Sequence, residues 1–298
     1  MSAAEISDIF AANPTLSHRY SFSTNATTAV WDSIGMAHGT LIGNAVVTNN
    51  ALKLNGVSGN YANLPGGLVS GSSAVTLECW ATFGANGNWA RVFDTGNITG
   101  AGGDHYFFYS PHNGSGGQQL ELNTSSTRTL AISGTLDNRG VHVACICDPA
   151  NNYMAVYTNG VLEAQLTASM PPVSGGVASA WSFIGRSLWS ADAYLNATID
   201  ELRLYDGRLT PQQIADNYIA GPNLLRGAIV PNGPAYLTNS ISGHTLSLSW
   251  PAGQGWRLQM ETNVASPNWV YLTNGSINST NITVDPTEPS VFYRLTYP

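Results

Sequence analysis

Turn-forming residues interrupt this chain about every eight to twelve residues, and between them lie short runs that are apolar or alternate apolar with polar side chains. This spacing predicts an all-β fold in which two antiparallel sheets form a jelly-roll sandwich. Asn159-Gly160 separates two alternating runs and predicts a type I′ hairpin turn. The clearest strand candidates are 18–22, 51–56, 75–83, 90–96, 104–110, 119–123, 141–148 and 153–166.

One helix is predicted over 211–219. Thr210 is a suitable N-cap, Pro211 fits the first helical position, and Gln213 completes a capping box. Gly221-Pro222 then ends the helix. Because the helix is short, we expect it to plug one end of the sandwich.

Composition divides the chain into four segments. Residues 1–15 read as a short helix and a lead-in that ends in proline, and residues 16–221 as the jelly roll. Residues 222–233 are rich in Pro and Gly and read as a linker. Residues 234–298 contain five strand-like runs and predict a small immunoglobulin-like β-sandwich.

The charge of the chain excludes several kinds of partner. The formal net charge is −7, and Lys53 is the single lysine beside ten arginines. Without a basic cluster the chain is not expected to bind nucleic acid or an anionic membrane surface. No apolar run is long enough to insert into a membrane. The first ten residues lack the regions of a signal peptide, so the protein is either cytosolic or secreted with its signal removed.

Three cysteines, Cys79, Cys145 and Cys147, show no metal-ligand spacing. Cys145 and Cys147 alternate within an apolar run, so both are expected to point into the core as free thiols. A disulfide between Cys79 and Cys145 is possible but cannot be deduced from the sequence.

Characteristic segments follow one another in a fixed order: LSHRYSF, WDSIGMAHGTLIG, ALKLNG with YANLP, VTLECWATF, NWARVFDTG, VHVACICD, YTNGVL and FIGRSLWSADAYLNATIDELRLYDGRLT. From Leu16 to Gly221 this order resembles the laminin-G-like, concanavalin A-like jelly rolls of secreted bacterial proteins. The final W…LQMETN…W…FYRL pattern resembles small sandwich modules that end such polypeptides. The resemblance implies secretion, a two-sheet sandwich that often binds calcium, and a carbohydrate-binding or adhesion role. Glycoside hydrolases and polysaccharide lyases share the fold, but the E-x-D-x-x-E motif of its retaining glucanases is absent.

Strand alternation predicts a candidate sugar site. Apolar positions of the strand candidates are assigned to the core, which leaves the intervening side chains on the outer faces. If the strands share one sheet, a single outer face carries Glu78, Trp80, Trp89, Arg91, Phe93, Gln119 and Glu121. Aromatic rings stack on sugars, and charged groups bind their hydroxyls. The alternative is that a loop or the second domain covers this face and that Arg91 only pairs with Glu78 or Glu121.

Two loops add candidates. His105 and Tyr106 follow a glycine-rich loop, which is typical of a binding loop or of a merely mobile one. Trp189 stands in a loop without an obvious core partner and is therefore a candidate ligand contact. Arg186 and Asp192 flank it, either as ligand contacts or as a structural ion pair.

Calcium is the only metal that the sequence favours. Asp32 stands in a Gly-containing loop, and the resemblance adds Asp200 before the last strand of the jelly roll. The alternative is that Asp32 forms an Asx-turn and that Asp200 accepts bonds from backbone amides.

The first functional hypothesis is a secreted, non-catalytic module that binds a polysaccharide on its aromatic outer face. The second is an extracellular hydrolase that uses Glu78 and Glu121, or a lyase that uses Arg91, His105 and Tyr106. The third is a structural adhesion or spacer module. The sequence identifies neither the glycan nor the oligomeric state.

Overall fold

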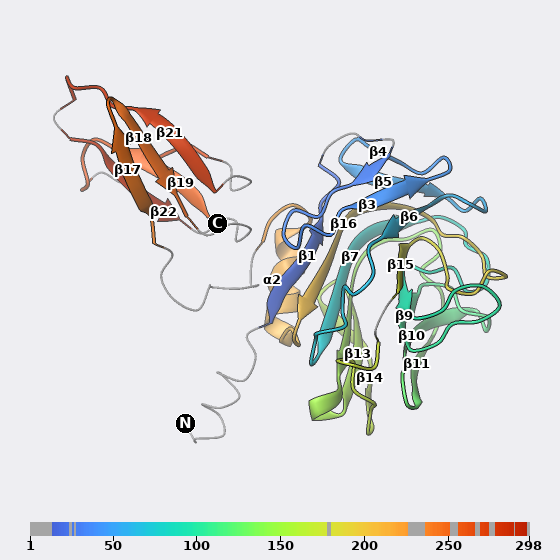
Figure 1. Cartoon of the computed structure of the whole chain (residues 1–298). Helices are drawn as coiled ribbons and strands as arrows, with labels where there is room; N and C mark the ends of the chain where they lie inside the picture. The colour runs from blue at the N-terminus through green and yellow to red at the C-terminus, as the bar shows by residue number, and fades with distance from the viewer. Residues whose placement is uncertain are drawn as a thin grey trace, which may run out of the picture. The chain divides into compact units, whose positions relative to one another are not determined.

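The computed structural model describes residues 14–225 and 236–296, apart from 24–25, 27, 178–179, 251–255, 266–268, 274–277 and 289. Most of the expected lead-in (1–15) and of the expected linker (222–233) lies outside the described residues. The chain divides between Asn223 and Leu224 into two compact units, and each is described by itself (Figure 1). No helix among the described residues is long and apolar enough to cross a membrane.

The first unit contains two large antiparallel sheets. Sheet A has the spatial order β14 (Val161–Thr167), β13 (Tyr153–Thr158), β12 (Gly140–Asp148), β7 (Val75–Phe83), β16 (Asn196–Asp206), β5 (Ala51–Asn55) and β4 (Val46–Thr48), and β1 (Thr15–Tyr20) also pairs with β16. A short 3₁₀ helix, η1 (Pro149–Asn151), joins β12 to β13. Asn159 and Gly160 both adopt positive φ, 52° and 79°, between β13 and β14, which confirms the predicted hairpin.

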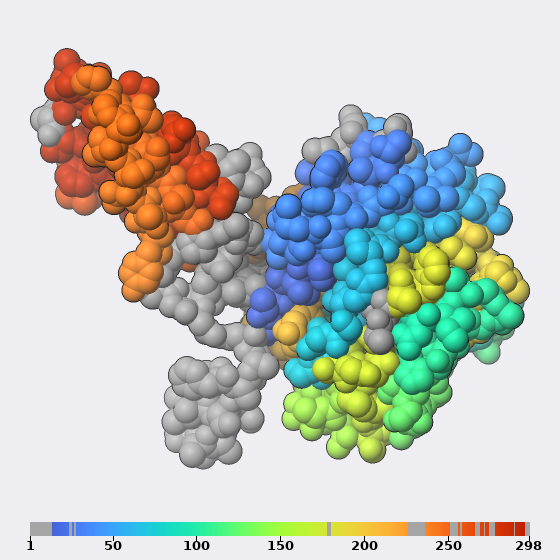
Figure 2. Space-filling model, in the orientation of Figure 1, coloured from blue at the N-terminus to red at the C-terminus, as the bar shows by residue number. Residues whose placement is uncertain are grey.

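Sheet B has the spatial order β11 (Thr127–Ser133), β10 (Gly117–Asn123), β9 (Tyr106–Ser110), β8 (Phe93–Gly96), β15 (Trp181–Ile184), β6 (Tyr61–Leu64), β3 (Gly39–Ile42) and β2 (Ala29–Val30). The all-β sandwich of two antiparallel sheets is therefore confirmed. Neighbouring strands come from distant parts of the chain, so that blue, cyan, green and yellow segments contribute to one surface (Figure 2).

The core lies between the two sheets and follows the predicted alternation. Leu77 from β7 and Leu120 from β10 belong to the same buried cluster. Cys79, Cys145 and Cys147 belong to it as well, and all three are free thiols. The prediction of buried free cysteines is confirmed, and no Cys79–Cys145 bridge forms.

Helix α2 (Pro211–Ala220) has the predicted capping box between Thr210 and Gln213. Its position differs from the prediction, because it covers the outer face of sheet A instead of plugging one end. Asn217 of α2 donates a hydrogen bond to Glu78 Oε2 at 2.9 Å. Glu78 is fully buried on this face and accepts further bonds from His142 and Tyr205. The helix thereby supplies a hydrogen-bond donor to a buried carboxylate of the sheet.

The second unit contains two three-stranded sheets. One consists of β17 (Thr238–Ser242), β18 (Thr245–Ser249) and β21 (Ser279–Thr283), and the other of β20 (Val270–Tyr271), β19 (Arg257–Glu261) and β22 (Phe292–Thr296). Leu248, Trp250 and Leu258 form its buried core. The sequence analysis missed β17, because its TNSIS sequence has no apolar alternation and every residue in it is exposed.

Candidate functional site

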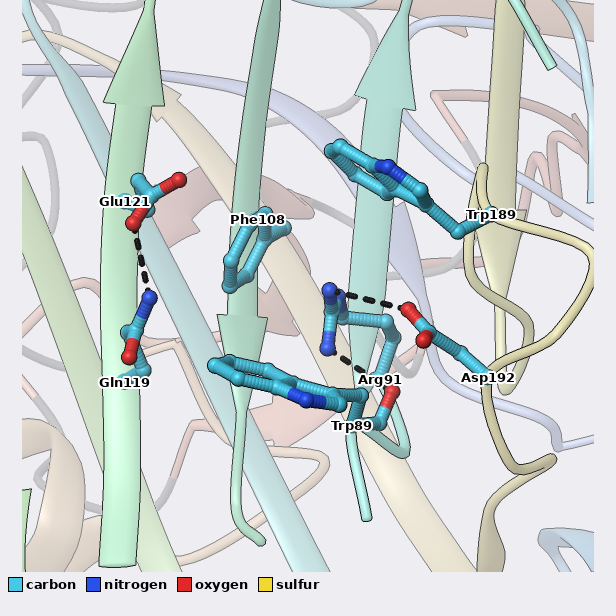
Figure 3. A pocket seen from close by; sticks show the side chains of 7 residues that line it. All are labelled: Trp89, Arg91, Phe108, Gln119, Glu121, Trp189 and Asp192. Carbon is cyan, nitrogen blue, oxygen red and sulfur yellow. Dashed lines mark hydrogen bonds and ion pairs between the residues drawn. The ribbon is translucent and has the colours of Figure 1, made fainter. Parts of the chain in front are cut away.

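A hollow of about 490 Å³, part of it open to solvent, lies on the outer side of sheet B. Its walls come from the segment before β8, from β9 and β10, and from the loop after β15. It is lined by Trp89, Arg91, Phe108, Gln119, Glu121, Trp189 and Asp192. Trp89 and Trp189 lie on opposite sides of Phe108 and Arg91 (Figure 3).

Trp89 reaches the hollow through an irregular stretch of backbone. Its φ is 65°, and its amide donates to the carbonyl of His112 at 2.8 Å. Because the chain turns here, Val92 and Phe93 both enter the core, and the strict alternation expected from 89 to 93 fails. The prediction that Phe93 faces outward is therefore wrong, whereas Arg91 does face the hollow.

Both indole rings lie against glycines of the polar loops. A Cβ atom on Gly114 would lie 2.6 Å from Nε1 of Trp89, and one on Gly103 would lie 2.7 Å from the ring of Trp189. Real side chains do not tolerate such distances. Gly103 and Gly114 are thus explained by close packing against a tryptophan.

Arg91 is buried and held from several sides. Its Nη1 donates to the carbonyl of Trp89 at 2.7 Å, and its Nη2 donates to Asp192 Oδ2 at 3.2 Å. Its Nε lies 3.4 Å from a carboxylate oxygen of Asp94. The guanidinium carbon lies 3.8 Å from the centre of the Phe108 ring. Burial lowers the pKa of Arg91, and the neighbouring carboxylates oppose this shift.

Glu121 stands on the β10 side of the hollow and accepts three side-chain hydrogen bonds. Tyr106 donates to its Oε1 at 2.6 Å, and Gln119 and Thr129 donate to its Oε2 at 2.7 and 2.6 Å. Burial, followed by the bond to Glu121, raises the pKa of Tyr106 well above its usual value. The phenol therefore keeps its proton at neutral pH.

The loop after β15 is fastened to the sheet by Asp94. This fully buried carboxylate accepts a hydrogen bond from the Leu188 amide at 3.0 Å. Burial raises the pKa of Asp94 to about 7, although the Arg91 guanidinium acts in the opposite direction. Ser187 donates to Asp192 Oδ2 at 2.7 Å, and the Trp189 ring meets the Tyr106 ring edge-on at 4.9 Å.

Six of the residues predicted from the sequence line the hollow, and Tyr106 contacts it through Glu121. These six are Trp89, Arg91, Gln119, Glu121, Trp189 and Asp192. Arg186 does not join them, because it donates to Tyr61 and Thr99 and lies over the Phe183 ring. The suggested Arg186–Asp192 pair is wrong, since Asp192 binds Arg91.

His105 is also outside the lining of the hollow and pairs with its neighbour Asp104 at 2.7 Å. Phe108 was missed by the sequence analysis. It belongs to the run YFFYS, in which every residue from 106 to 109 is aromatic, so alternation could not separate the inner face from the outer one.

Glu78 and Trp80 are not part of this site. Both stand on β7 in sheet A, whereas Trp89 and Glu121 belong to the side of sheet B. The expectation of one shared outer face is therefore wrong, and the Glu78–Glu121 carboxylate pair does not form. The Trp80 ring instead lies 4.3 Å from the guanidinium carbon of Arg203 in the buried network under α2.

Asp32, one of the two proposed calcium residues, has other partners. Asp32 Oδ1 accepts from the amides of Arg19, Ile34 and Gly35, and its Oδ2 accepts from the Ala37 amide and the His18 ring. These donors hold the pKa of Asp32 below its usual value although burial raises it. Such N–H groups do not fit a cation site, because they occupy the oxygens that an ion would need.

Asp200 is half-buried on β16, and burial raises the pKa of its carboxyl group against the opposing charge of Lys53. Within the described ranges, no three or more His, Cys, Asp or Glu residues gather where they could hold a metal ion. Calcium stays a prediction from the sequence.

The chain is similar to known proteins in sequence and in fold. Residues 55–215 match the family model described as concanavalin A-like lectin/glucanases superfamily, Laminin_G_3. Domain 4 of AbnA, a GH43 extracellular arabinanase from Geobacillus stearothermophilus solved with arabinotriose, is 26% identical, with a TM-score of 0.56 over 68% of this chain and 98% of that one. Trypanosoma rangeli sialidase is 17% identical, with a TM-score of 0.53, and the match covers 68% of this chain but 32% of the sialidase. No curated protein matches the chain.

Proposed function

Because this chain belongs to the concanavalin A-like lectin/glucanases superfamily, we propose that it is a secreted carbohydrate-binding module that holds an oligosaccharide without catalysis between Trp89 and Trp189. The observation that carries the proposal is the pair of indole rings on opposite sides of one hollow, with Phe108 between them (Figure 3). Aromatic faces bind the apolar faces of sugar rings. The similar arabinanase domain, solved with arabinotriose, supports a saccharide ligand.

Polar groups between the rings complete the site. Gln119 and Glu121 stand on one side of Arg91 and Asp192 stands on the other (Figure 3). Sugar hydroxyls both donate and accept hydrogen bonds, so carboxylate oxygens beside guanidinium and amide N–H groups match their chemistry. The network among these side chains is formed before a ligand arrives, which lowers the entropy cost of binding.

The carboxylates of the site support binding more than hydrolysis. A glycosidase needs two carboxyl groups about 5 to 10 Å apart on either side of the scissile bond. Glu121 already accepts three bonds, and Glu78 is buried in the other sheet. Glu78 is therefore not the second carboxyl group of a hydrolase at this hollow, and the other carboxylate of the lining, Asp192, is paired with Arg91.

The lyase alternative has a similar difficulty. A lyase needs an arginine that neutralises a uronate and a base that removes a proton. Arg91 is paired with Asp192 and Asp94, and Tyr106 keeps its proton because its pKa is raised. His105 does not line the hollow.

Calorimetry and an activity assay test the proposal together. The protein is titrated with arabinotriose and a panel of other oligosaccharides, and the same mixtures are assayed for new reducing ends and unsaturated products. We expect binding without turnover. Turnover would establish the enzyme, and a complete lack of binding would favour the spacer module.

A further inference from the structure

We propose that Asp192 makes this hollow select neutral sugars against carboxylated ones, because it occupies the place on Arg91 that a sugar carboxylate would take. The inference rests on the proposed function and concerns the class of sugar that the site accepts. It assigns Asp192 a role in specificity that is distinct from stacking.

Arg91 is the natural binding partner for an anionic sugar, since a guanidinium pairs with carboxylates. Both Nη groups nevertheless donate a hydrogen bond within the protein, and the side chain is only 3% exposed. The Nη2 group donates to Asp192 at 3.2 Å, Nη1 donates to the Trp89 carbonyl at 2.7 Å, and Nε lies 3.4 Å from Asp94. The flat face of the guanidinium lies over Phe108. A ligand carboxylate would have to displace Asp192 to pair with Arg91.

The charges of the lining residues also disfavour a carboxylated sugar. Among the seven lining residues Arg91 is the only cation, whereas Glu121 and Asp192 carry carboxylates. Asp94 adds a third carboxyl group directly behind Arg91. An anionic ligand therefore meets an excess of negative charge. Repulsion is stronger here than in bulk water, because aromatic rings wall the hollow and lower the local dielectric constant.

Neutral sugars do not meet this penalty. Their hydroxyls can donate to Asp192 and Glu121, and stacking on Trp89 and Trp189 is independent of charge. The expected ligand class is thus a neutral oligosaccharide. Sugars with a carboxylate at the bound residue are expected to be rejected.

A matched pair of ligands tests this selectivity. Arabinotriose is compared with arabinotriose whose free primary hydroxyl has been oxidised to a carboxylate, against wild type, Asp192→Asn and Asp216→Asn. Asn keeps the shape of Asp192 and can still accept a hydrogen bond from Arg91, but it removes the negative charge that competes with a ligand carboxylate. The control residue Asp216 lies on α2 and accepts a hydrogen bond from Gln212. We expect wild type and Asp216→Asn to prefer the neutral trisaccharide about tenfold or more, and Asp192→Asn to lose most of that preference.

The outcomes separate the two proposals. Equal wild-type binding of both trisaccharides overturns the inference and leaves the proposed function intact. If no oligosaccharide of the panel binds, both proposals are overturned; if another neutral oligosaccharide binds instead, that ligand and its oxidised form take the place of the two trisaccharides. If Asp192→Asn does not fold, the preference of wild type for the neutral trisaccharide is measured at low and at high salt. Because salt screens electrostatic repulsion, we expect this preference to be smaller at high salt. A preference that does not change with salt would overturn the inference.

Discussion

Asp192 Oδ2 accepts a hydrogen bond from Arg91 Nη2 at 3.2 Å, although the two residues stand 101 positions apart in the sequence. Arg91 stands two residues after Trp89 and shortly before β8, and Asp192 stands three residues after Trp189 in the loop after β15. The bond thus fastens together the two segments that carry the tryptophans. Their indole rings are held in place before a ligand binds, which is a condition for affinity from a few stacking contacts.

Removing either ring from the hollow should weaken ligand binding. We expect Trp89→Ala and Trp189→Ala each to cost about 1–3 kcal/mol, which is about ten- to a hundredfold in affinity. Calorimetry with the best oligosaccharide measures the change. Trp31→Ala is the matched control, because Trp31 is 54% exposed and does not line the hollow. If both site variants bind like wild type, the hollow is not the binding site.

The glycines behind the rings should matter for binding in the same way. Gly114→Ala and Gly103→Ala place a Cβ atom within 2.6 Å of Trp89 and 2.7 Å of Trp189, so each ring must move. We expect each variant to lose about fivefold or more in affinity, on the order of 1 kcal/mol. Gly71→Ala is the control, since a Cβ there meets nothing within 4 Å. Unchanged affinity in both site variants would show that the ring positions do not control binding.

Acid should destabilise the jelly roll partly through Asp32. Its folded pKa lies below the value in the unfolded chain, so the unfolded chain takes up a proton first as the pH falls. The stability that Asp32 contributes is complete above about pH 5 and is lost as the pH drops through its folded pKa. Asp32→Asn should lower the stability at pH 7 by about 2 kcal/mol and flatten the acid limb of a plot of Tm against pH. An acid limb identical to that of wild type contradicts the assignment.

Calcium has its own test at the same residue. Because five N–H donors already engage Asp32, we expect Tm to be the same with excess calcium and with a chelator. Asp200→Asn should behave like wild type in both conditions. A calcium-dependent rise in Tm that Asp32→Asn or Asp200→Asn abolishes would establish the ion that the sequence predicts.

Glu78 should matter for stability and not for the ligand. Glu78→Gln removes a buried charge that accepts bonds from His142, Tyr205 and Asn217 and lies 3.8 Å from Arg203. We expect the free energy of unfolding, measured with denaturant, to fall by about 3 kcal/mol, while the ligand affinity of the folded variant stays unchanged. Glu121→Gln serves as the comparison in sheet B, where we expect affinity to fall. Turnover in wild type that either change abolishes would support the hydrolase instead.

Much of the fold follows from local patterns in the sequence. The β7 strand begins and ends where the apolar alternation of 75–83 does, and α2 begins at the Thr210 capping box. The hairpin at Asn159-Gly160 needs only residues that tolerate positive φ. Each of these features depends on neighbours within a few positions, so the chain specifies it without reference to the rest of the molecule.

The membership of each strand in a sheet was decided by tertiary structure. Glu78 and Trp89 are close in sequence, but β7 pairs with β12 and β16 in sheet A, and β8 pairs with β9 and β15 in sheet B. Alternation tells which side chains leave the core, but not which of the two outer faces they reach. The candidate residues at 89, 91, 121, 189 and 192 meet because long-range pairing brings β8, β9, β10 and the loop after β15 together. In regular strands such as β7 and β10 the sequence determined which residues leave the core, but it failed at Phe93, where the backbone turns, and in the aromatic run that holds Phe108. The pairing of distant strands determined which outward residues share a site, because sheet contacts join residues that no local pattern relates.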